Sequence, residues 1–264
     1  MSATEAWSAG DRYEPYVGRW SRLVARPFVS WLEQPTDLRW LDVGCGTGAL
    51  VETILDCSAP RAVDGIDASK AFVDHARAHV LDPRARFTVA DACALPFDAS
   101  SFDAAVSALV LNFVPEPRAA LGEMIRVARP GALVATYVWD YARGMRMMRV
   151  FWDAAVRLDP AAQARDEGRR FPICSRQGLH RLFTEAGLVD VQVRAIDITT
   201  RFRDFDDYWS PFLGGQGPAP TYLMSIDSTR RDSLRERIRD ALPLAADGSI
   251  ELDARAWAAR GRVP

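Results

Sequence analysis

Three glycines, Gly44, Gly46 and Gly48, stand at alternate positions in the stretch LDVGCGTGAL, where a strand-like segment ends. Glycine lets the backbone adopt left-handed conformations and lets a ligand approach the main chain closely. If a helix begins behind the glycines, its N-terminus adds unpaired N–H donors and a partial positive charge, which suit an anionic group. The loop therefore predicts either a cofactor site or a strand-to-helix turn without a ligand. The spacing Gly44-x-Gly46-x-x-Ala49 also satisfies the fingerprint of dinucleotide-binding folds.

Asp42, two residues before the first glycine, favours one class of cofactor over another. A dinucleotide brings a pyrophosphate with two negative charges, which an ionised aspartate would repel. A ligand with an ammonium or sulfonium group beside its carboxylate would tolerate that charge or be attracted to it. S-adenosylmethionine has all three groups and no phosphate. A turn-capping role for Asp42 stays open as the structural alternative.

Two further aspartates, Asp67 and Asp91, end the next two strand-like segments. At the first position a carboxylate can accept both hydroxyls of a ribose. At the second it could accept from an adenine amino group, with the N–H of Ala92 facing a ring nitrogen. Ligands of open α/β sheets bind at the carboxyl ends of the strands, so three acids at three such ends indicate one site more strongly than any single acid. A helix cap near Ser69 and a plain strand-end turn are the alternatives for the two residues.

Strands and helices alternate through the first half of the chain. Several strand-like segments are apolar at consecutive positions, as strands buried on both faces are. The pattern predicts a doubly wound α/β sheet with right-handed crossovers. We expect strands at 39–43, 61–67, 86–91, 102–111 and 132–140, helices at 49–56, 69–80 and 118–128, and a turn at Pro130-Gly131.

Beyond residue 140 the alternation gives way to aromatic and arginine-rich segments. No repeat, low-complexity stretch or long linker divides the chain, so we expect one domain over 1–264. Its expected later elements are helices at 145–157, 175–188 and 225–242 and strands at 189–198 and 249–261. The expected parts are N-terminal lid helices at 10–36, a cofactor-binding core at 37–140, lid or substrate-pocket insertions at 141–174 and 204–242, and a final strand at 249–261.

Four stretches resemble successive motifs of class I S-adenosylmethionine-dependent methyltransferases. They are LDVGCGTG, GIDASKAFVDHAR, VADACALPFDASSFDAAVSALVLNFVPEP and EMIRVARPGALV. The resemblance is to the small-molecule branch related to ubiquinone- and menaquinone-biosynthesis methyltransferases; it is close over 10–140 and loose over the last strand. It implies a Rossmann-like, mostly parallel seven-stranded sheet whose final strand, at 249–261, runs antiparallel. It also implies S-adenosylmethionine as the cofactor, S-adenosylhomocysteine as the product and no metal.

The resemblance also implies roles for individual residues. Gly44 and Gly46 would lie along the methionine, Asp67 on the ribose and Asp91 near the adenine. The segment 13–32 would form a lid with an arginine or tyrosine at the methionine carboxylate, although an amphipathic helix docked on the sheet fits it equally. The expected cofactor-binding residues are Tyr16, Arg22, Asp42, Gly44, Cys45, Gly46, Asp67, Ala68, Asp91, Ala92, Ala108 and Leu109.

Similar enzymes often carry a histidine after the fourth strand, but this chain has Asn112 there, which cannot titrate. A base is needed only if the acceptor must lose a proton first. We therefore assign no catalytic residue and expect methyl transfer through proximity and orientation. Aromatic side chains near the same sheet edge could wall an apolar acceptor pocket or belong to the core. The candidate substrate residues are Tyr13, Trp20, Asn112, Trp139, Trp152 and Trp209.

The composition argues against several other classes of protein. The formal charge is −2, so no basic field indicates a nucleic-acid partner. The cysteines form no CxxC pair and the histidines do not cluster with them, which disfavours a metal site or a disulfide framework. No apolar run reaches the about 20 residues that span a bilayer, and the N-terminus is too polar for a signal peptide. We expect a cytoplasmic protein without membrane insertion, and its arginine-dominated composition is typical of a bacterial source.

The sequence thus predicts a methyltransferase that uses S-adenosylmethionine on a small, partly apolar acceptor molecule. The rival enzyme is an NAD(P)-dependent oxidoreductase, which would need a phosphate site and a proton-transfer residue. No catalytic Tyr/Lys pair is evident, since Lys70 stands alone. A cofactor-binding protein without turnover is the third interpretation, because no general base is evident.

Overall fold

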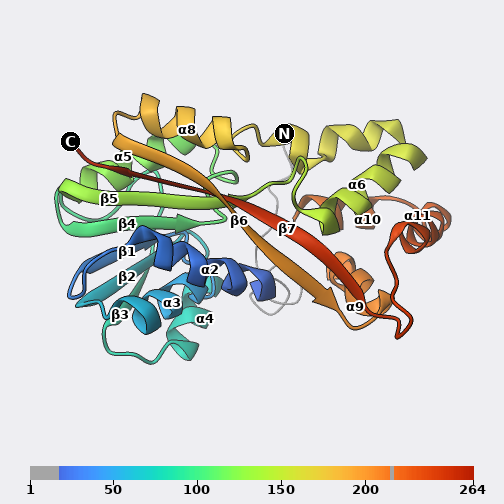
Figure 1. The fold of residues 1–264 in the computed structure, drawn as a ribbon, viewed down its shortest axis with the longest axis horizontal. Coiled ribbons are helices and arrows are strands. Elements are labelled where there is room, and N and C mark those ends of the chain that lie inside the picture. The colour runs from blue at the N-terminus through green and yellow to red at the C-terminus, as the bar shows by residue number, and fades with distance from the viewer. Residues whose placement is uncertain (1–17, 215–216) are drawn as a thin grey trace.

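A seven-stranded sheet in the order β3-β2-β1-β4-β5-β7-β6 organises the protein. The computed structural model describes residues 18–214 and 217–264 (Figure 1). Strands β1 to β5 pair in parallel, whereas β7 runs antiparallel to both β5 and β6. The strands are β1 Arg39–Val43, β2 Ala62–Asp67, β3 Ala85–Val89, β4 Phe102–Ala108, β5 Ala128–Trp139, β6 Val189–Phe202 and β7 Ile250–Arg262.

The direction of β7 separates this sheet from a dinucleotide-binding one. A doubly wound dinucleotide fold has the order 3-2-1-4-5-6 with parallel strands. Here an antiparallel strand lies between β5 and β6. The predicted α/β class and the antiparallel last strand at 249–261 are therefore confirmed.

Helices cover both faces of the sheet. Helix α5 packs on β4 and β5 and α8 packs on β6 and β7, while α3 and α4 pack on β2 beside α2 (Figure 1). Local signals explain where two of them begin: the Ser69 hydroxyl accepts from the N–H of Phe72 at the start of α4, and Pro117 occupies the first position of α5. The bounds are α2 Arg19–Leu32, α3 Ala49–Ser58, α4 Lys70–His79, α5 Pro117–Val127 and α8 Arg176–Glu185.

Several expected boundaries of the strands were wrong, and two of them have a local cause. Strand β4 ends at Ala108 rather than at residue 111, because Leu109 adopts a left-handed conformation with φ 60°. The expected turn at Pro130-Gly131 lies inside β5, where the register against β4 shifts after Phe102. Gly131, at φ 77°, lets the strand absorb this bulge and continue.

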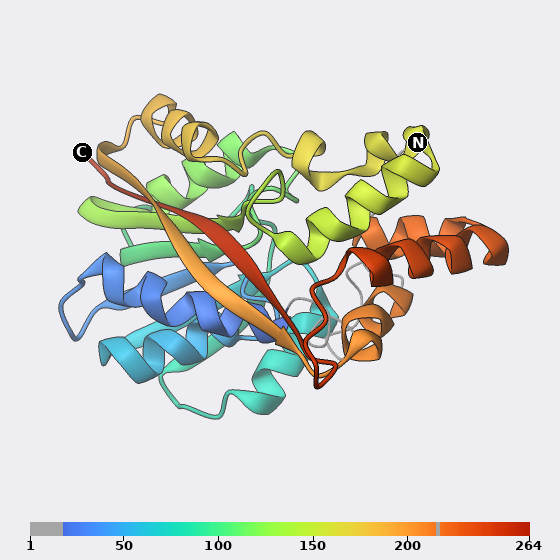
Figure 2. The same ribbon diagram turned by 45° about the vertical axis from the view of Figure 1, so that its right-hand side comes forward.

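Two insertions form a cap beyond the carboxyl edge of the sheet (Figure 2). The first follows β5 and the second follows β6, and they meet where α6 packs against α10 and α11. The first insertion holds α6 Arg146–Leu158, η2 Pro160–Arg165 and α7 Glu167–Arg170; the second holds α9 Phe205–Trp209, η3 Ser210–Gly214, α10 Pro218–Ser225 and α11 Ser228–Ala241. The cap has its own aromatic core, in which Phe151 stacks on Phe212 with ring centroids 4.7 Å apart.

Candidate active site

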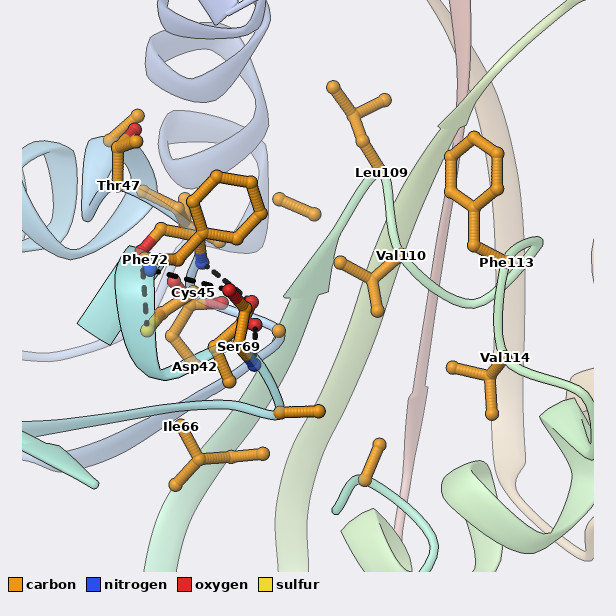
Figure 3. A pocket seen from close by; sticks show the side chains of 18 of the residues that line it. Asp42, Cys45, Thr47, Ile66, Ser69, Phe72, Leu109, Val110, Phe113 and Val114 are labelled. Carbon is orange, nitrogen blue, oxygen red and sulfur yellow. Dashed lines mark hydrogen bonds between the residues drawn. The ribbon is translucent and has the colours of Figure 1, made fainter. Parts of the chain in front are cut away.

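A cavity of about 640 Å³ opens at the carboxyl ends of the parallel strands. The glycine loop after β1 lies on one side of it, together with Phe72 from the first turn of α4 (Figure 3). Leu109, Val110 and Phe113 lie on the other side. The volume is within the range of small-molecule sites. The structure thus brings residues from five strand ends to one place.

Gly44 and Gly46 have different reasons for lacking a side chain. Both have positive φ, 77° and 52°. A Cβ on Gly44 would come within 2.4 Å of the Val110 side chain, so this glycine lets the loop pack against the turn after β4. A Cβ on Gly46 would meet nothing within 4 Å, and Gly46 lines the cavity. The second glycine therefore leaves room for a ligand.

The N–H groups of the glycine loop are already used inside the protein. Those of Gly44 and Cys45 both donate to the carbonyl of Ile66, at 2.7 and 2.8 Å. The N–H of Gly46 donates to Asp67 at 3.0 Å, and that of Gly48 to the Cys45 carbonyl at 2.9 Å. These four N–H groups are therefore not available to an anionic ligand such as a pyrophosphate. The unpaired donors that we expect at a helix behind the glycines belong to α3, which begins at Ala49.

Asp67 lines the cavity with a carboxylate held from both sides. One oxygen accepts from the N–H of Gly46, and the other accepts from the N–H of Ser69 at 2.8 Å. Each oxygen keeps a lone pair for a ligand hydroxyl. Burial raises the pKa of Asp67, although the two backbone donors counteract this rise.

Asp42 lies beside it in a different environment. Its side chain is 1% exposed, and neither carboxylate oxygen accepts a hydrogen bond within the described residues. Burial, followed by the nearby charge of Asp67, raises the pKa of Asp42 to about 8. Asp42 is therefore mostly protonated at neutral pH in the ligand-free protein. The predicted repulsion between an ionised Asp42 and a pyrophosphate is weak for this reason, and the occupied N–H groups of the loop replace it as the argument against a dinucleotide.

Asp91 and four apolar residues complete this end of the cavity. The Asp91 carboxylate accepts from the N–H of Cys93 at 2.8 Å and is itself exposed. Leu109 holds its strained left-handed conformation by donating its N–H to the Tyr137 carbonyl at 2.8 Å. Besides the glycine-loop residues and the two aspartates, the predicted residues that line the cavity are Asp91, Ala68, Ala92, Ala108 and Leu109.

The opposite end of the cavity is aromatic and aliphatic, and we call it the acceptor end. Phe113, Val114, Tyr137, Trp139 and Tyr141 line it. Among the described lining residues of the whole cavity there is no lysine, arginine or histidine, whereas Asp42, Asp67 and Asp91 are present. The acceptor end can therefore hold an apolar group, and the cavity as a whole disfavours an anionic one.

Several predicted site residues lie elsewhere. Arg22 forms an ion pair with Glu52 on the outer side of α2 and does not line the cavity. Trp20 packs edge-on against Phe202 with ring centroids 5.2 Å apart, also away from the cavity. The docking of α2 on its neighbours places both side chains. The helical spacing of the segment 13–32 agrees with such docking and requires no lid role. Tyr13 and Tyr16 fall outside the described residues.

Three candidate substrate residues are also absent from the cavity wall. Trp152 and Trp209 are buried in the core of the cap. Asn112 is 7% exposed, and its amide nitrogen and oxygen have no hydrogen-bond partner within the described residues. Of the described candidates, Trp139 alone reaches the cavity.

A periodic signal could have identified the missed acceptor residues. Tyr137, Trp139 and Tyr141 are spaced two apart along and just beyond β5, so they share one face of the strand. Phe113 and Val114 directly follow Asn112 in the motif that the sequence singles out. Ser21, Thr47 and Phe72 also line the cavity and had no comparable signal.

Residues 41–136 match a family whose description is "Methyltransferase domain". This match begins within β1, just before the glycine loop, and ends within β5, so it covers the cavity's cofactor end. This segment is similar to a methyltransferase domain.

Curated relatives of this chain act on apolar molecules according to their names. The chain is 37% identical over 115 residues to squalene methyltransferase 2 of Botryococcus braunii. This alignment covers 42% of this chain and 30% of that protein. It is also 37% identical over 107 residues to a demethylmenaquinone methyltransferase of Roseiflexus castenholzii. This second alignment covers 40% of this chain and 45% of that protein. The chain thus spans less than half the length of these two relatives.

Solved structures share the fold of this chain. One is a Haemonchus contortus phosphoethanolamine N-methyltransferase 2 in complex with phosphomonomethylethanolamine and S-adenosylhomocysteine, with a TM-score of 0.59, 17% identity, and coverage of 97% of this chain and 57% of that chain. Another is a geranyl diphosphate C-methyltransferase of Streptomyces coelicolor in complex with Mg²⁺, geranyl diphosphate and S-adenosylhomocysteine, with a TM-score of 0.54, 19% identity, and coverage of 93% and 80%. At these identities the likeness concerns the fold.

The described residues contain neither a membrane-spanning helix nor a cluster of metal ligands. None of their helices has the length and apolar character to cross a membrane. Within 18–214 and 217–264, no three His, Cys, Asp or Glu side chains gather as metal ligands would.

Proposed function

We propose that this chain transfers a methyl group from S-adenosylmethionine to a small, neutral and mainly apolar acceptor. The observation that carries the proposal is the arrangement of Asp67, Gly46 and Asp42 around one cavity of a sheet with an antiparallel β7. Relatives named as squalene and demethylmenaquinone methyltransferases support it. We further propose that residues 1–264 act as one domain.

The residues at the cofactor end fit S-adenosylmethionine group by group. Asp67 would accept from the ribose hydroxyls, because each of its oxygens keeps a lone pair beside its backbone donor. The open face of Gly46 would receive the methionine chain. Asp91, exposed two residues after β3, would accept from the adenine amino group. The cofactor, when bound, supplies a methyl group activated by its positive sulfur.

Asp42 fits the same ligand through charge. Its carboxyl group has no hydrogen-bond partner within the described residues and its pKa lies near 8, so it is mostly neutral before a ligand binds. A positive ammonium or sulfonium group nearby would lower that pKa and favour the ionised form. Binding would then release a proton from Asp42, and the resulting carboxylate would stabilise the positive ligand.

The acceptor would be neutral because no cation lines the described cavity. The acceptors named for the two solved structures carry a phosphate or diphosphate. Such a group here would face three aspartates without a lysine or arginine among the described lining residues. A ring or chain without charge would instead contact Phe113, Trp139 and Tyr141.

The chain's contribution to the reaction would be orientation and exclusion of water. None of the three histidines lines the cavity, and Asn112 does not reach it. The wall of Leu109, Val110 and Phe113 would hold the acceptor atom near the methyl group, in line with the bond that breaks. Holding two reactants in line at about 3 Å can supply a large part of a rate acceleration.

The proposed compartment is the cytoplasm of a bacterium. Within the described residues, Cys45, Cys57, Cys93 and Cys174 all carry unbridged thiols, which a reducing compartment maintains.

Calorimetric titration with S-adenosylmethionine, S-adenosylhomocysteine, NADH and NADPH tests the cofactor. We expect binding of the first two, and a loss of about ten- to hundredfold in affinity for Asp67→Ala, because hydrogen bonds to a charged group are lost. Asp74→Ala is the matched control, since Asp74 is an exposed acid on α4 that pairs with Lys70. Binding of the nicotinamide nucleotides alone would overturn the proposal.

Transfer of radiolabelled methyl groups tests the reaction. We expect label to appear on a prenylated naphthoquinol or hydroquinone and not on phosphoethanolamine. Tight binding of S-adenosylhomocysteine without transfer to any neutral apolar acceptor in the panel would indicate a binding protein instead.

A further inference from the structure

A short helix of the cap is fixed by two buried polar contacts. Arg149 on α6 donates to both oxygens of Asp166, at 3.1 and 2.8 Å. One turn later Trp152 donates its indole N–H to Glu167. Asp166 caps α7 by accepting from the N–H of Gly168 at 2.9 Å, and Glu167 is the first residue of that helix. Both ends of these contacts are buried.

A buried ion pair is a weak means of stabilising a protein. The cost of removing two charges from water offsets most of their attraction, and well-packed apolar residues often serve as well. The Arg149–Asp166 pair does offer geometry, because a bidentate contact fixes both the distance and the orientation of the two groups. Gly168 shows how closely α7 is held, since a Cβ there would lie 2.8 Å from Nη1 of Arg149 and 2.9 Å from the Tyr141 carbonyl.

The helix fixed in this way ends at an aromatic residue that backs the acceptor end of the cavity. Phe171 follows α7 and donates its N–H to the Glu167 carbonyl at 3.0 Å. Its ring meets Phe113 edge-on with centroids 5.2 Å apart and lies 6.0 Å from the ring of Tyr141. Phe113 and Tyr141 line the cavity, whereas Phe171 does not. Phe171 therefore touches the outer side of the wall that an acceptor would touch from within.

We propose that Phe171 and Arg149 are positioning residues for acceptor binding. The Arg149–Asp166 and Trp152–Glu167 contacts hold α7, α7 holds Phe171, and Phe171 holds Phe113 and Tyr141 at the spacing that the acceptor requires. The ligand class that this wall suits is a neutral molecule with a planar ring, because aromatic rings favour edge-on contacts such as the one that Phe171 makes with Phe113. This inference rests on the proposed function, because it concerns the acceptor end of the same cavity.

Binding of N-phenyl-1-naphthylamine, a neutral ring-bearing fluorescent probe, tests this inference on the full chain saturated with S-adenosylhomocysteine. We expect Phe171→Ala and Phe171→Leu to weaken probe binding about two- to tenfold, because an aromatic contact behind the wall is lost. Phe171→Tyr keeps the ring and should retain the affinity. If Phe171 only filled space, Phe171→Leu and Phe171→Tyr should bind the probe with equal affinity.

Arg149→Lys tests the step through α7. It keeps the charge but cannot make the bidentate contact, so we expect a similar loss of probe affinity with unchanged affinity for S-adenosylhomocysteine. Arg157→Ala is the matched control, because Arg157 is an exposed arginine on the same helix. If Arg149→Lys fails to fold, the comparison of Phe171→Leu with Phe171→Tyr still decides.

The outcomes separate this inference from the proposed function. Wild-type protein that binds S-adenosylhomocysteine but shows equal probe affinity in all Phe171 variants would overturn the inference and leave the proposed function standing. Probe binding that is absent, or indifferent to Tyr141→Ala, would overturn the ligand class. A wild-type protein that does not bind S-adenosylhomocysteine would instead refute the proposed function.

Discussion

The two ends of the cavity are held in shape by different parts of the chain. At the cofactor end, backbone groups of one loop bond to the neighbouring strand: Gly44 and Cys45 donate to Ile66, and Gly46 donates to Asp67. At the acceptor end, side-chain rings meet across long sequence separations, as Phe113 meets Phe171. The first arrangement depends on a short motif, and the second depends on the packing of the cap. Substitutions should therefore separate binding of the cofactor from binding of the acceptor.

The largest expected effect concerns the buried acid of the cofactor end. The pKa of Asp42 is raised to about 8 from 3.8, so the folded protein holds a proton that the unfolded chain has already lost between those values. Stability should therefore fall as the pH rises through this window, by up to about 1.4 kcal/mol per pH unit from this group, and level off above pH 8.

Denaturant unfolding from pH 5 to 9 measures this slope. Asp42→Asn should flatten it and make the protein more stable than wild type at pH 8, while Asp74→Asn should keep the wild-type slope. An unchanged slope in Asp42→Asn would mean that Asp42 is ionised in the folded protein. The proposal that Asp42 releases a proton when a positively charged ligand binds would then lose its basis.

The two glycines of the loop should respond differently to the same substitution. Gly44→Ala should destabilise the protein by about 3 kcal/mol, from strain at positive φ and overlap with Val110. Gly46→Ala should cost only the strain at φ 52°, about 1 kcal/mol, yet weaken S-adenosylhomocysteine binding more. Adding Val110→Ala to Gly44→Ala should recover the part due to overlap. Thermal unfolding and calorimetry of these three variants would contradict this division if both glycines behaved alike.

Phe113→Ala should disturb the acceptor end alone. We expect about tenfold weaker binding of N-phenyl-1-naphthylamine, from the loss of a buried aromatic contact, with S-adenosylhomocysteine affinity unchanged within a factor of two. Equal losses of affinity for both ligands would show that the two ends of the cavity are structurally coupled.

The smallest effect is expected on the outer surface of α2. Arg22 pairs with Glu52 where both side chains are largely exposed, so Arg22→Ala should change stability by less than about 1 kcal/mol. S-adenosylhomocysteine affinity should not change, because Arg22 does not line the cavity. A tenfold loss of affinity on calorimetric titration would restore the lid role expected from the resemblance.

The cofactor end could be predicted largely from the sequence, because its residues follow strand ends. Parallel strands deliver their carboxyl ends to one edge of the sheet, so Asp42, Asp67 and Asp91 had to converge once the strands were recognised. The charge of Asp42 could not be predicted in this way. Its protonation depends on burial, which three-dimensional packing decides.

The residues of the acceptor end could be predicted from the sequence only in small part. Trp139, Trp152 and Trp209 looked alike as aromatic candidates, yet Trp139 lines the cavity and the other two form the core of the cap. A side chain's spacing along its own helix or strand tells which face it occupies, but not what that face meets.

The sequence by itself determined the parallel strands and the backbone loop after β1, through consecutive apolar residues and through glycines and acids at strand ends. The final antiparallel strand was implied by the resemblance to methyltransferases. The tertiary structure alone decided that α7 places Phe171 behind Phe113 and Tyr141, and that Arg22 turns away from the cavity to Glu52. Such contacts join residues far apart in the chain, and their partners are chosen by how whole elements pack rather than by any local pattern.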